Sequence, residues 1–162
     1  MSNRLPVFKL KLVQERSLGV PPIRCDSPPQ VMALMFQMLI GNADREHVAA
    51  VFFGVHGNAL GATVIGIGAL SEVLVQPREV FKCALLMNAT SLVLAHNHPS
   101  NIAKASPPDI LTTLSLVHAG DILGVKVIDH LIVTPTGGFA SFVELGLMAG
   151  RAGEPVVKRS NL

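Results

Sequence analysis

The chain has 162 residues, of which 15% are charged, and a mean hydropathy of +0.48. A chain of this length forms one domain with a substantial core, and so apolar a composition argues against disorder. The net charge of +2 comes with no concentrated basic stretch, and there is no Trp or Tyr to stack on bases. Direct nucleic-acid binding therefore has no support in the composition.

The first predicted element is a strand at residues 7–13. Phe8, Leu10 and Leu12 alternate there with two lysines. Such alternation predicts a strand with one buried face, and the lysines suit the edge of a sheet.

A helix is predicted next, from an N-cap at Ser27 to about Ile40, with prolines in its first turn. Its apolar residues form one stripe, made of Val31, Leu34, Met35 and Met38. We interpret the methionines as core filler and not as a binding surface.

No Asp, Glu, Lys or Arg occurs from His47 to Ser71, which is long enough for a membrane-spanning helix of about twenty residues. A polar turn at residues 56–58 divides this stretch into two strand-sized halves, 48–55 and 59–70, both rich in β-branched residues and glycine. We therefore predict two paired core strands and no membrane span.

The remaining elements alternate between helix and strand. A helix from Pro77 to about Asn88 is expected to pack on the sheet, and an apolar strand follows at residues 90–95. Further along we predict a helix from Ser106 to near Gly124, two strands at 125–134 and 139–143, and an appended tail after Gly150.

Two histidines directly follow the apolar strand at 90–95, and an aspartate comes eleven residues later. Side chains two apart in an extended segment point the same way, so His96 and His98 can converge on one ion. Asp109 would complete three protein ligands and leave a fourth position for water. Catalytic zinc is held in this way.

The spacing of these residues resembles the signature of the JAMM (JAB1/MPN) metallopeptidases: His-x-His, seven residues, Ser, two residues, Asp. Several other sequence words resemble the RadC branch of that superfamily, including Pro77-Arg-Glu-Val-Phe81, Ala95-His-Asn-His-Pro-Ser100 and Asp129-His-Leu-Ile-Val133. The resemblance covers about residues 44–148. It implies an α/β fold of the JAB1/MPN (cytidine-deaminase-like) type, a mixed curved sheet flanked by helices, with residues 1–43 in the same domain and 149–162 as a tail.

The resemblance also implies a function, a zinc-dependent metallopeptidase or isopeptidase that acts on a protein or peptide. It implies that His96, His98 and Asp109 bind zinc, that Glu46 is the catalytic base, and that Ser106 donates a hydrogen bond to the oxyanion of the tetrahedral intermediate. Other acids that could serve as the base are Glu72 and Glu79, which we rank below Glu46.

Some of these residues also have structural interpretations. Ser106 and Asp109 have the spacing of a helix capping box, which is compatible with metal binding. His130 is expected to be a hydrogen-bonded structural group beside the site. The remaining histidines, His47, His56 and His118, have no ligand spacing to the motif. An alternative function is an adaptor in DNA repair, recombination or mobile-element and anti-defence complexes, with zinc mainly structural.

The chain departs from the family pattern in two places. Members usually have glycine where this chain has Asn101, a residue that tolerates left-handed backbone. They also carry an N-terminal helix-hairpin-helix, which the roughly forty residues before Glu46 are too few to hold, so we expect a short form.

Two expectations concern the protein's surroundings. The high apolar content predicts a homodimer or a surface for another partner. Cys25 and Cys83 lie in no C-x-x-C pattern and no signal peptide is visible, so we expect free thiols and a cytoplasmic location.

Overall fold

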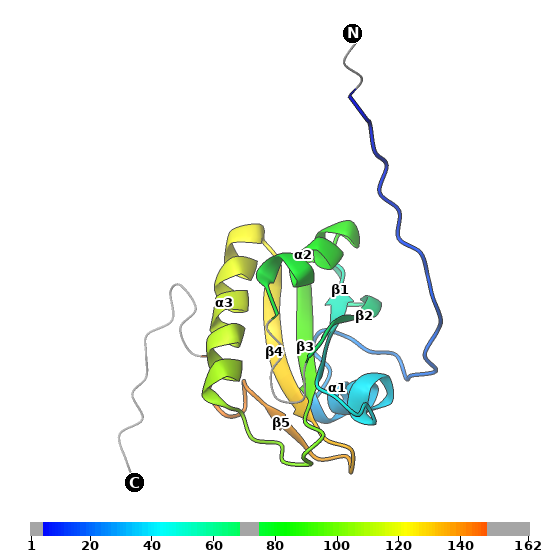
Figure 1. Ribbon diagram of the computed structural model, residues 1–162. Helices are drawn as coiled ribbons and strands as arrows, with labels where there is room; N and C mark the ends of the chain where they lie inside the picture. The colour runs from blue at the N-terminus through cyan, green and yellow to red at the C-terminus, as the bar shows by residue number, and fades with distance from the viewer. Residues whose placement is uncertain (1–4, 69–74, 149–162) are drawn as a thin grey trace.

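The structure is a computed structural model and describes residues 5–68 and 75–148 (Figure 1). Within them, five strands form one mixed sheet in the order β2-β1-β3-β4-β5. The neighbours β3 and β4 are parallel, and the other pairs are antiparallel. The strands are β1 (His47–Phe53), β2 (Ala59–Ile67), β3 (Ser91–Asn97), β4 (Lys126–Val133) and β5 (Phe139–Ser141).

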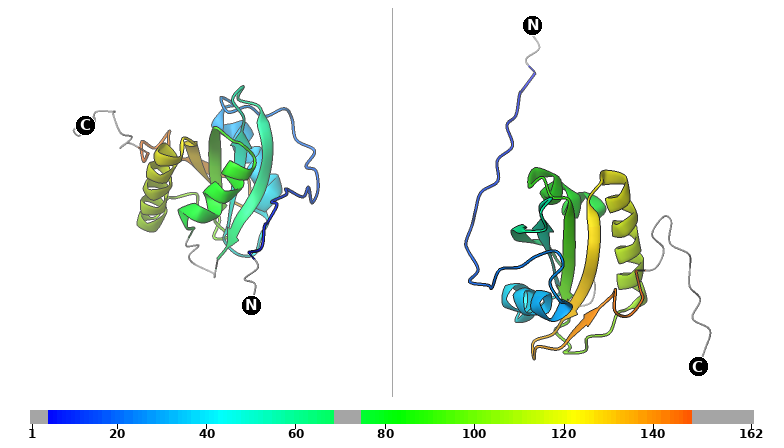
Figure 2. Two further views of the ribbon diagram at one scale, coloured as in Figure 1. Left: turned by 90° about the horizontal axis from the view of Figure 1, so that it is seen from above. Right: turned by 180° about the vertical axis from the view of Figure 1, so that it is seen from behind.

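Helices cover both faces of this sheet (Figures 1 and 2). One face carries α1 (Pro29–Phe36) and the short π-helical turn η1 (Gln37–Gly41) that continues it. The other face carries α2 (Pro77–Leu86) and α3 (Pro107–Leu123). This architecture confirms the predicted α/β class with a mixed sheet flanked by helices.

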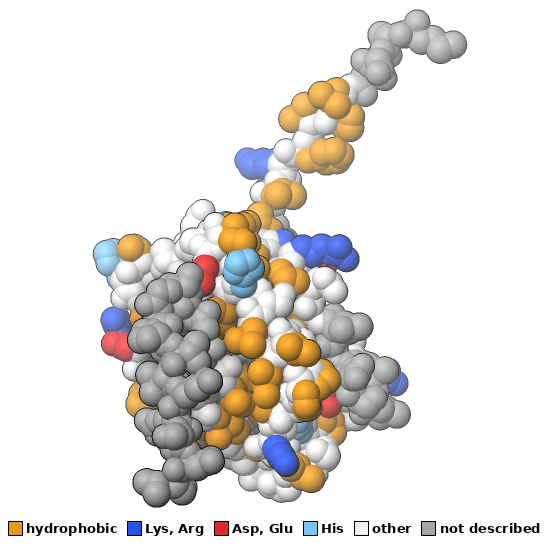
Figure 3. Space-filling model, turned by 90° about the vertical axis from the view of Figure 1, so that its left-hand side faces the viewer, with side chains coloured by type: hydrophobic (Ala, Val, Ile, Leu, Met, Phe, Trp, Pro, Cys, Tyr) orange, Lys and Arg blue, Asp and Glu red, His pale blue; other side chains and the backbone are white. Residues whose placement is uncertain are grey.

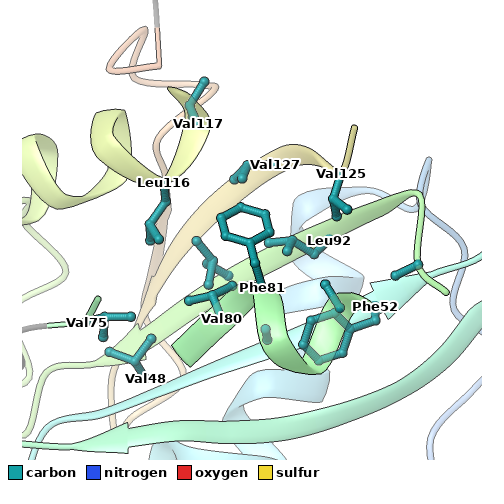
Figure 4. Close-up of a cluster of buried hydrophobic side chains, with 14 of the residues drawn as sticks. Val48, Phe52, Val75, Val80, Phe81, Leu92, Leu116, Val117, Val125 and Val127 are labelled. Carbon is teal, nitrogen blue, oxygen red and sulfur yellow. The ribbon is translucent and has the colours of Figure 1, made fainter. Parts of the chain in front are cut away.

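The central strands are apolar on both faces because both faces are covered. In β1, Val48, Ala50 and Phe52 belong to the core under α2 and α3, shown in Figure 4. The residues between them, Ala49, Val51 and Phe53, belong to the core under α1. Fully burying one large apolar side chain contributes about 1.5–3 kcal/mol, so the two layers together hold the central strands in place.

A β-bulge in β4 changes which of its side chains face α3. In the pairing with β3, Leu92 lies opposite Val127 but Val93 lies opposite Asp129, so Ile128 is an extra residue. Such a bulge moves every later side chain to the other face of the sheet. His130 therefore lies on the α3 side, the side that also carries Leu94.

The predicted strand at residues 7–13 is wrong. The segment is extended but pairs with no described strand, and its apolar side chains are exposed, with Phe8 at 83% and Leu10 at 74%. Alternating apolar and polar residues form a strand only where another strand is available for pairing. Among the described residues this segment has no such partner.

The first helix differs from the prediction at its start and on its buried face. Its N-cap is Pro28, and the Ser27 hydroxyl instead accepts a hydrogen bond from the Arg24 backbone N–H at 2.9 Å. Leu34 and Met38 are exposed, at 67% and 55%. Leu34 lies within α1, whose buried residues are its neighbours Met32, Ala33, Met35 and Phe36. Met38 lies in the π-helical turn, which changes the angular spacing from 3.6 residues per turn, so the expected stripe does not continue there. The residues that pack into the core are Met32, Ala33, Met35, Phe36 and Ile40.

The uncharged stretch forms a hairpin, as predicted: β1 and β2 pair antiparallel around a turn that contains His56. Among the described residues, no helix is both long and apolar enough to cross a membrane.

Candidate metal centre

The end of β3 and the start of α3 bring three candidate ligands together. His96 is the next-to-last residue of β3, His98 follows the strand, and Asp109 lies in the first turn of α3. One ligand atom from each lies within 4.8 Å of the others. The two histidine Nε2 atoms are 3.0 Å apart, and the carboxylate oxygens lie 3.6 Å from Nε2 of His96 and 3.9 Å from Nε2 of His98.

A capping box at the start of α3 fixes Asp109. The Ser106 backbone N–H and hydroxyl both donate to Asp109 Oδ2, at 2.8 and 2.7 Å. The Ser106 hydroxyl oxygen in turn accepts from the Asp109 N–H at 3.3 Å. This confirms the predicted capping box, and it leaves Oδ1 turned towards His96.

The electrostatic surroundings keep Asp109 ionised. Partial burial acts to raise its pKa, but a protonated His96 beside the carboxylate and the hydrogen bonds from Ser106 outweigh burial and hold the pKa well below its usual range; in the neutral state of His96 the bonds from Ser106 remain. The helix N-terminus also favours an anion at this position. The site therefore supplies a carboxylate throughout the physiological pH range.

Hydrogen bonding also determines which nitrogen of His98 is free. Its Nδ1 lies 2.8 Å from the carbonyl oxygen of Ile102. A carbonyl can only accept, so Nδ1 carries the hydrogen and the neutral ring has a lone pair on Nε2.

A longer chain of hydrogen bonds fixes the tautomer of His96. The Thr113 hydroxyl donates to the Asp109 carbonyl oxygen at 2.6 Å, so its oxygen must accept from His130 Nδ1, also at 2.6 Å. His130 then has its lone pair on Nε2, which accepts from His96 Nδ1 at 2.8 Å. His96 is left with a lone pair on Nε2, and we assign it that tautomer.

This assignment requires His130 to be neutral. Complete burial lowers the pKa of His130 well below its ordinary value, and the neighbouring His96 lowers it further. The ring also stacks on Phe142, with centroids 4.7 Å apart.

The two histidines thus point lone pairs at each other across 3.0 Å, beside a carboxylate. Three electron-rich groups in this arrangement repel one another unless a cation lies between them. Ligands at about 2.0–2.1 Å from one tetrahedral ion are about 3.3 Å apart, and the observed separations of 3.0, 3.6 and 3.9 Å bracket that value. The donor set therefore fits a metal ion.

A small cavity of about 30 Å³ adjoins the cluster, which is room for a water molecule. Polar residues from four segments line it: His96 of β3, Asp109 and Thr112 of α3, His130 of β4, and Glu46, the residue just before β1. Val48 pairs with His96 in the antiparallel register, so the chain before β1 runs past the metal cluster. The structure thus brings Glu46 to the wall of the cavity that His96 and Asp109 line.

The side chain of Asn97 holds the backbone on both sides of Glu46. Its Oδ1 accepts from the His47 N–H at 2.6 Å, and its Nδ2 donates to the Arg45 carbonyl at 3.0 Å. Asn97 is fully buried and alternates with His96 and His98, so it points to the α1 face of the sheet.

The other two candidate bases lie elsewhere. Glu79 sits in the first turn of α2 and pairs with Lys82 and Arg78; the hydrogen bond from Lys82 is the main reason that its pKa is lowered. It does not line the cavity. Glu72 lies outside the described residues.

The remaining predictions about single residues can be compared directly with the structure. His130 is hydrogen-bonded beside the site, as expected. Asn101 has a left-handed backbone, with φ of 62°, and its side chain accepts from the Thr136 hydroxyl at 2.6 Å, so the turn that usually carries glycine is kept. His118 and His56 are exposed, and His47 Nδ1 contacts the Arg45 carbonyl.

Two residues of the site, Thr113 and Asn97, escaped the sequence analysis. Thr113 lies four residues after Asp109 on α3, so helical spacing alone could have placed it on the same side as the ligand. Asn97 could have been noticed as the polar residue whose side chain must point into the opposite, apolar face.

The sequence has clear relatives. The family model described as the RadC-like JAB domain matches residues 25–147. A UPF0758 protein of Rubrobacter xylanophilus is 41% identical over 138 residues, which is 85% of this chain and 59% of that protein. A UPF0758 protein of Desulforamulus reducens is 40% identical over 111 residues, which is 68% of this chain and 48% of that protein. A UPF0758 protein of Methanococcoides burtonii is 41% identical over 105 residues, which is 65% of this chain and 45% of that protein. The chain thus spans about half the length of the curated relatives that it matches.

Proposed function

The chain belongs to the RadC-like JAB domain family, and on that premise we propose that it is a metal-dependent hydrolase that cleaves a peptide or isopeptide bond. The observation that carries the proposal is the pair of Nε2 lone pairs of His96 and His98, 3.0 Å apart beside the Asp109 carboxylate. We expect zinc, because two imidazoles and one carboxylate are a typical ligand set for catalytic zinc. Zinc held there would supply Lewis acidity for the activation of water at neutral pH.

The residues around the cluster have separate tasks in this proposal. Glu46, on the cavity wall, would accept a proton from the attacking water and return it to the leaving amine. The Ser106 hydroxyl would donate to the oxyanion that forms as the scissile carbonyl becomes tetrahedral. In the structure that hydroxyl donates to Asp109 Oδ2, so it must turn towards the substrate during the reaction.

The test combines metal analysis with turnover. We expect the purified protein to hold about one zinc per chain and His98→Ala to lose it. Glu46→Gln should keep the zinc but lower turnover of a responsive peptide or isopeptide substrate about 10²–10⁴-fold, the usual contribution of a general base.

Glu79→Gln is the matched control. It changes an acid in exposed ion pairs away from the cavity and should leave turnover unchanged. A wild-type protein that binds no zinc, or a Glu46→Gln variant as active as the wild type, would contradict the proposal. Zinc that is bound without turnover of any peptide or isopeptide substrate would favour the adaptor alternative, in which zinc is mainly structural.

A further inference from the structure

Two parts of the described chain are built for strand pairing but have no strand partner there. One is the extended N-terminal segment at residues 7–13, which we call the arm. The other is the outer edge of β2, the strand at one end of the sheet. We propose that the arm of one chain pairs with the β2 edge of a second copy, so that two chains exchange arms in a homodimer. This inference does not depend on the proposed hydrolase activity.

The arm has the pattern of a half-buried strand but is exposed to solvent. Its apolar side chains Phe8, Leu10 and Leu12 are 83%, 74% and 54% exposed, and they alternate with Lys9 and Lys11. Figures 1 and 2 show the arm leading away from the body of the protein. Burial of apolar surface is favourable, so such a segment is more stable against an apolar surface than in water.

The β2 edge lacks the usual protection against pairing. Natural edge strands are commonly guarded by charged residues, prolines or a covering segment. The nine residues of β2, ALGATVIGI, contain no charge and no proline. Among residues 5–68 and 75–148, β2 pairs along its length only with β1. Val64, which faces the α1 side through its pairing with Ala49, stays 38% exposed, and Ile67 stays 63% exposed.

The base of the arm already pairs with the start of this edge. Arg24 and Asn58 form an antiparallel bridge, the Ala59 N–H donates to the Ile23 carbonyl at 3.3 Å, and the Cys25 N–H donates to the Gly57 carbonyl at 2.8 Å. The β2 edge is thus accessible to an antiparallel chain, and the arm is tethered beside it.

The register of that bridge prevents simple continuation of the pairing within one chain. Each step back from Arg24 is a step forward from Asn58, so Val13 would fall opposite position 69, beyond the end of β2 at Ile67. The segment that would face β2 instead is residues 15–23, which contains two prolines and a glycine. Proline has no N–H for the ladder. A second copy has no such restriction, because its arm can take any register.

The experiment measures mass and hydrogen exchange on the full chain. Light scattering at micromolar concentration should give twice the chain mass of 17.1 kDa. A Leu10→Lys, Leu12→Lys double variant should give the single-chain mass, with amide exchange in residues 59–67 at least tenfold faster. Both substitutions are at exposed positions outside the two core clusters, so the fold itself should be unaffected.

The matched control changes the other face of the arm. Lys9→Gln, Lys11→Gln should remain dimeric, with the same protection of β2. A wild-type mass of one chain would overturn the proposal. If β2 of such a single chain were still protected from amide exchange by the arm, the arm would be folding back on its own sheet. A dimer that persists in the Leu10→Lys, Leu12→Lys variant would also overturn it and would point to another face. One such face is that of α3, where Leu111 and Ile122 are 69% and 72% exposed. Figure 3 shows hydrophobic side chains exposed on this side of the molecule.

Discussion

The hydroxyl hydrogen of Thr113 determines the tautomer of His96, although the two residues are connected only through His130. Because that hydroxyl donates to the Asp109 carbonyl, the Thr113 oxygen must accept from His130 Nδ1, and His130 Nε2 must in turn accept from His96 Nδ1; we call this chain of hydrogen bonds the relay. The last lone pair in the relay is Nε2 of His96, which faces His98. A buried threonine with no contact to the proposed metal position thus sets the tautomer of one ligand.

Replacing Thr113 with valine, which has the same shape, should therefore weaken metal binding. His130 would lose the acceptor for its Nδ1 hydrogen and could adopt the other tautomer, which would put a hydrogen on the Nε2 of His96. We expect the zinc affinity to fall about 10–100-fold, measured by competition with a chelating dye. Thr113→Ser keeps the hydroxyl and should bind nearly as tightly as the wild type. Equal affinity for Thr113→Val would show that the relay does not set the tautomer.

Asn97 should separate the placement of Glu46 from the binding of metal. Asn97→Ala would leave the His47 N–H without its buried partner, at a cost of about 1–3 kcal/mol, whereas the Arg45 carbonyl would keep its contact with His47 Nδ1. We expect a lower free energy of unfolding in urea, zinc content close to that of the wild type, and a fall in kcat larger than any change in KM. Loss of the zinc together with turnover would instead assign Asn97 a role in holding β3.

At the scale of the elements, Asp129 joins β4 to the chain around β5. Its carboxylate accepts from the Ser141 hydroxyl at 2.6 Å and from the backbone N–H groups of His130 and Val143 at 2.7 and 3.1 Å. Burial raises the pKa of Asp129, and these hydrogen bonds offset that effect only in part. The native state therefore binds a proton at this site more readily than the unfolded chain does.

This raised pKa predicts a pH dependence with a definite sign. The stability that Asp129 contributes is fully present below its unfolded pKa, near 3.8, and is lost as the pH rises through the folded pKa. The unfolding free energy of the wild type minus that of Asp129→Asn should therefore decrease with rising pH, by at most ~1.4 kcal/mol per pH unit. Urea denaturation of both proteins between acidic and neutral pH measures it. A difference that grows with pH would contradict the assignment.

How much of the fold and site the sequence predicts depends on the range of the interactions involved. The histidine pair and Asp109 were predictable because strand alternation and helix capping fix their directions locally. The bulge at Ile128, which turns His130 towards α3, depends on the pairing of β3 with β4 and leaves no local pattern. The prediction of a strand in the arm was wrong for a related reason. Periodicity indicates which side chains share a face, but it does not indicate whether another strand is available for pairing.

At the scale of the whole molecule, the arm and the metal centre are independent. None of residues 5–19 belongs to either core cluster, and the side-chain hydrogen bond from Gln14 to Ser17, just after the arm, is local. Val20 packs against the core under α1, and Ile23, which is 8% exposed, is the first buried residue of that core.

Two truncations should reveal this boundary. Removal of residues 1–16 should leave about one zinc per chain and, at protein concentrations low enough for single chains, an unchanged urea midpoint. At higher concentration the wild-type midpoint should rise, because dimerisation stabilises the folded state by mass action, whereas the truncated chain should show no such rise. Removal of residues 1–26 also deletes Ile23 and its bond to Ala59, and should cost about 2–5 kcal/mol, as the loss of a large core side chain does. If the protein without residues 1–16 loses zinc or stability at low concentration, the arm packs on its own domain. If the urea midpoint rises with concentration both in the wild type and in that truncated protein, the dimer contact lies outside the arm.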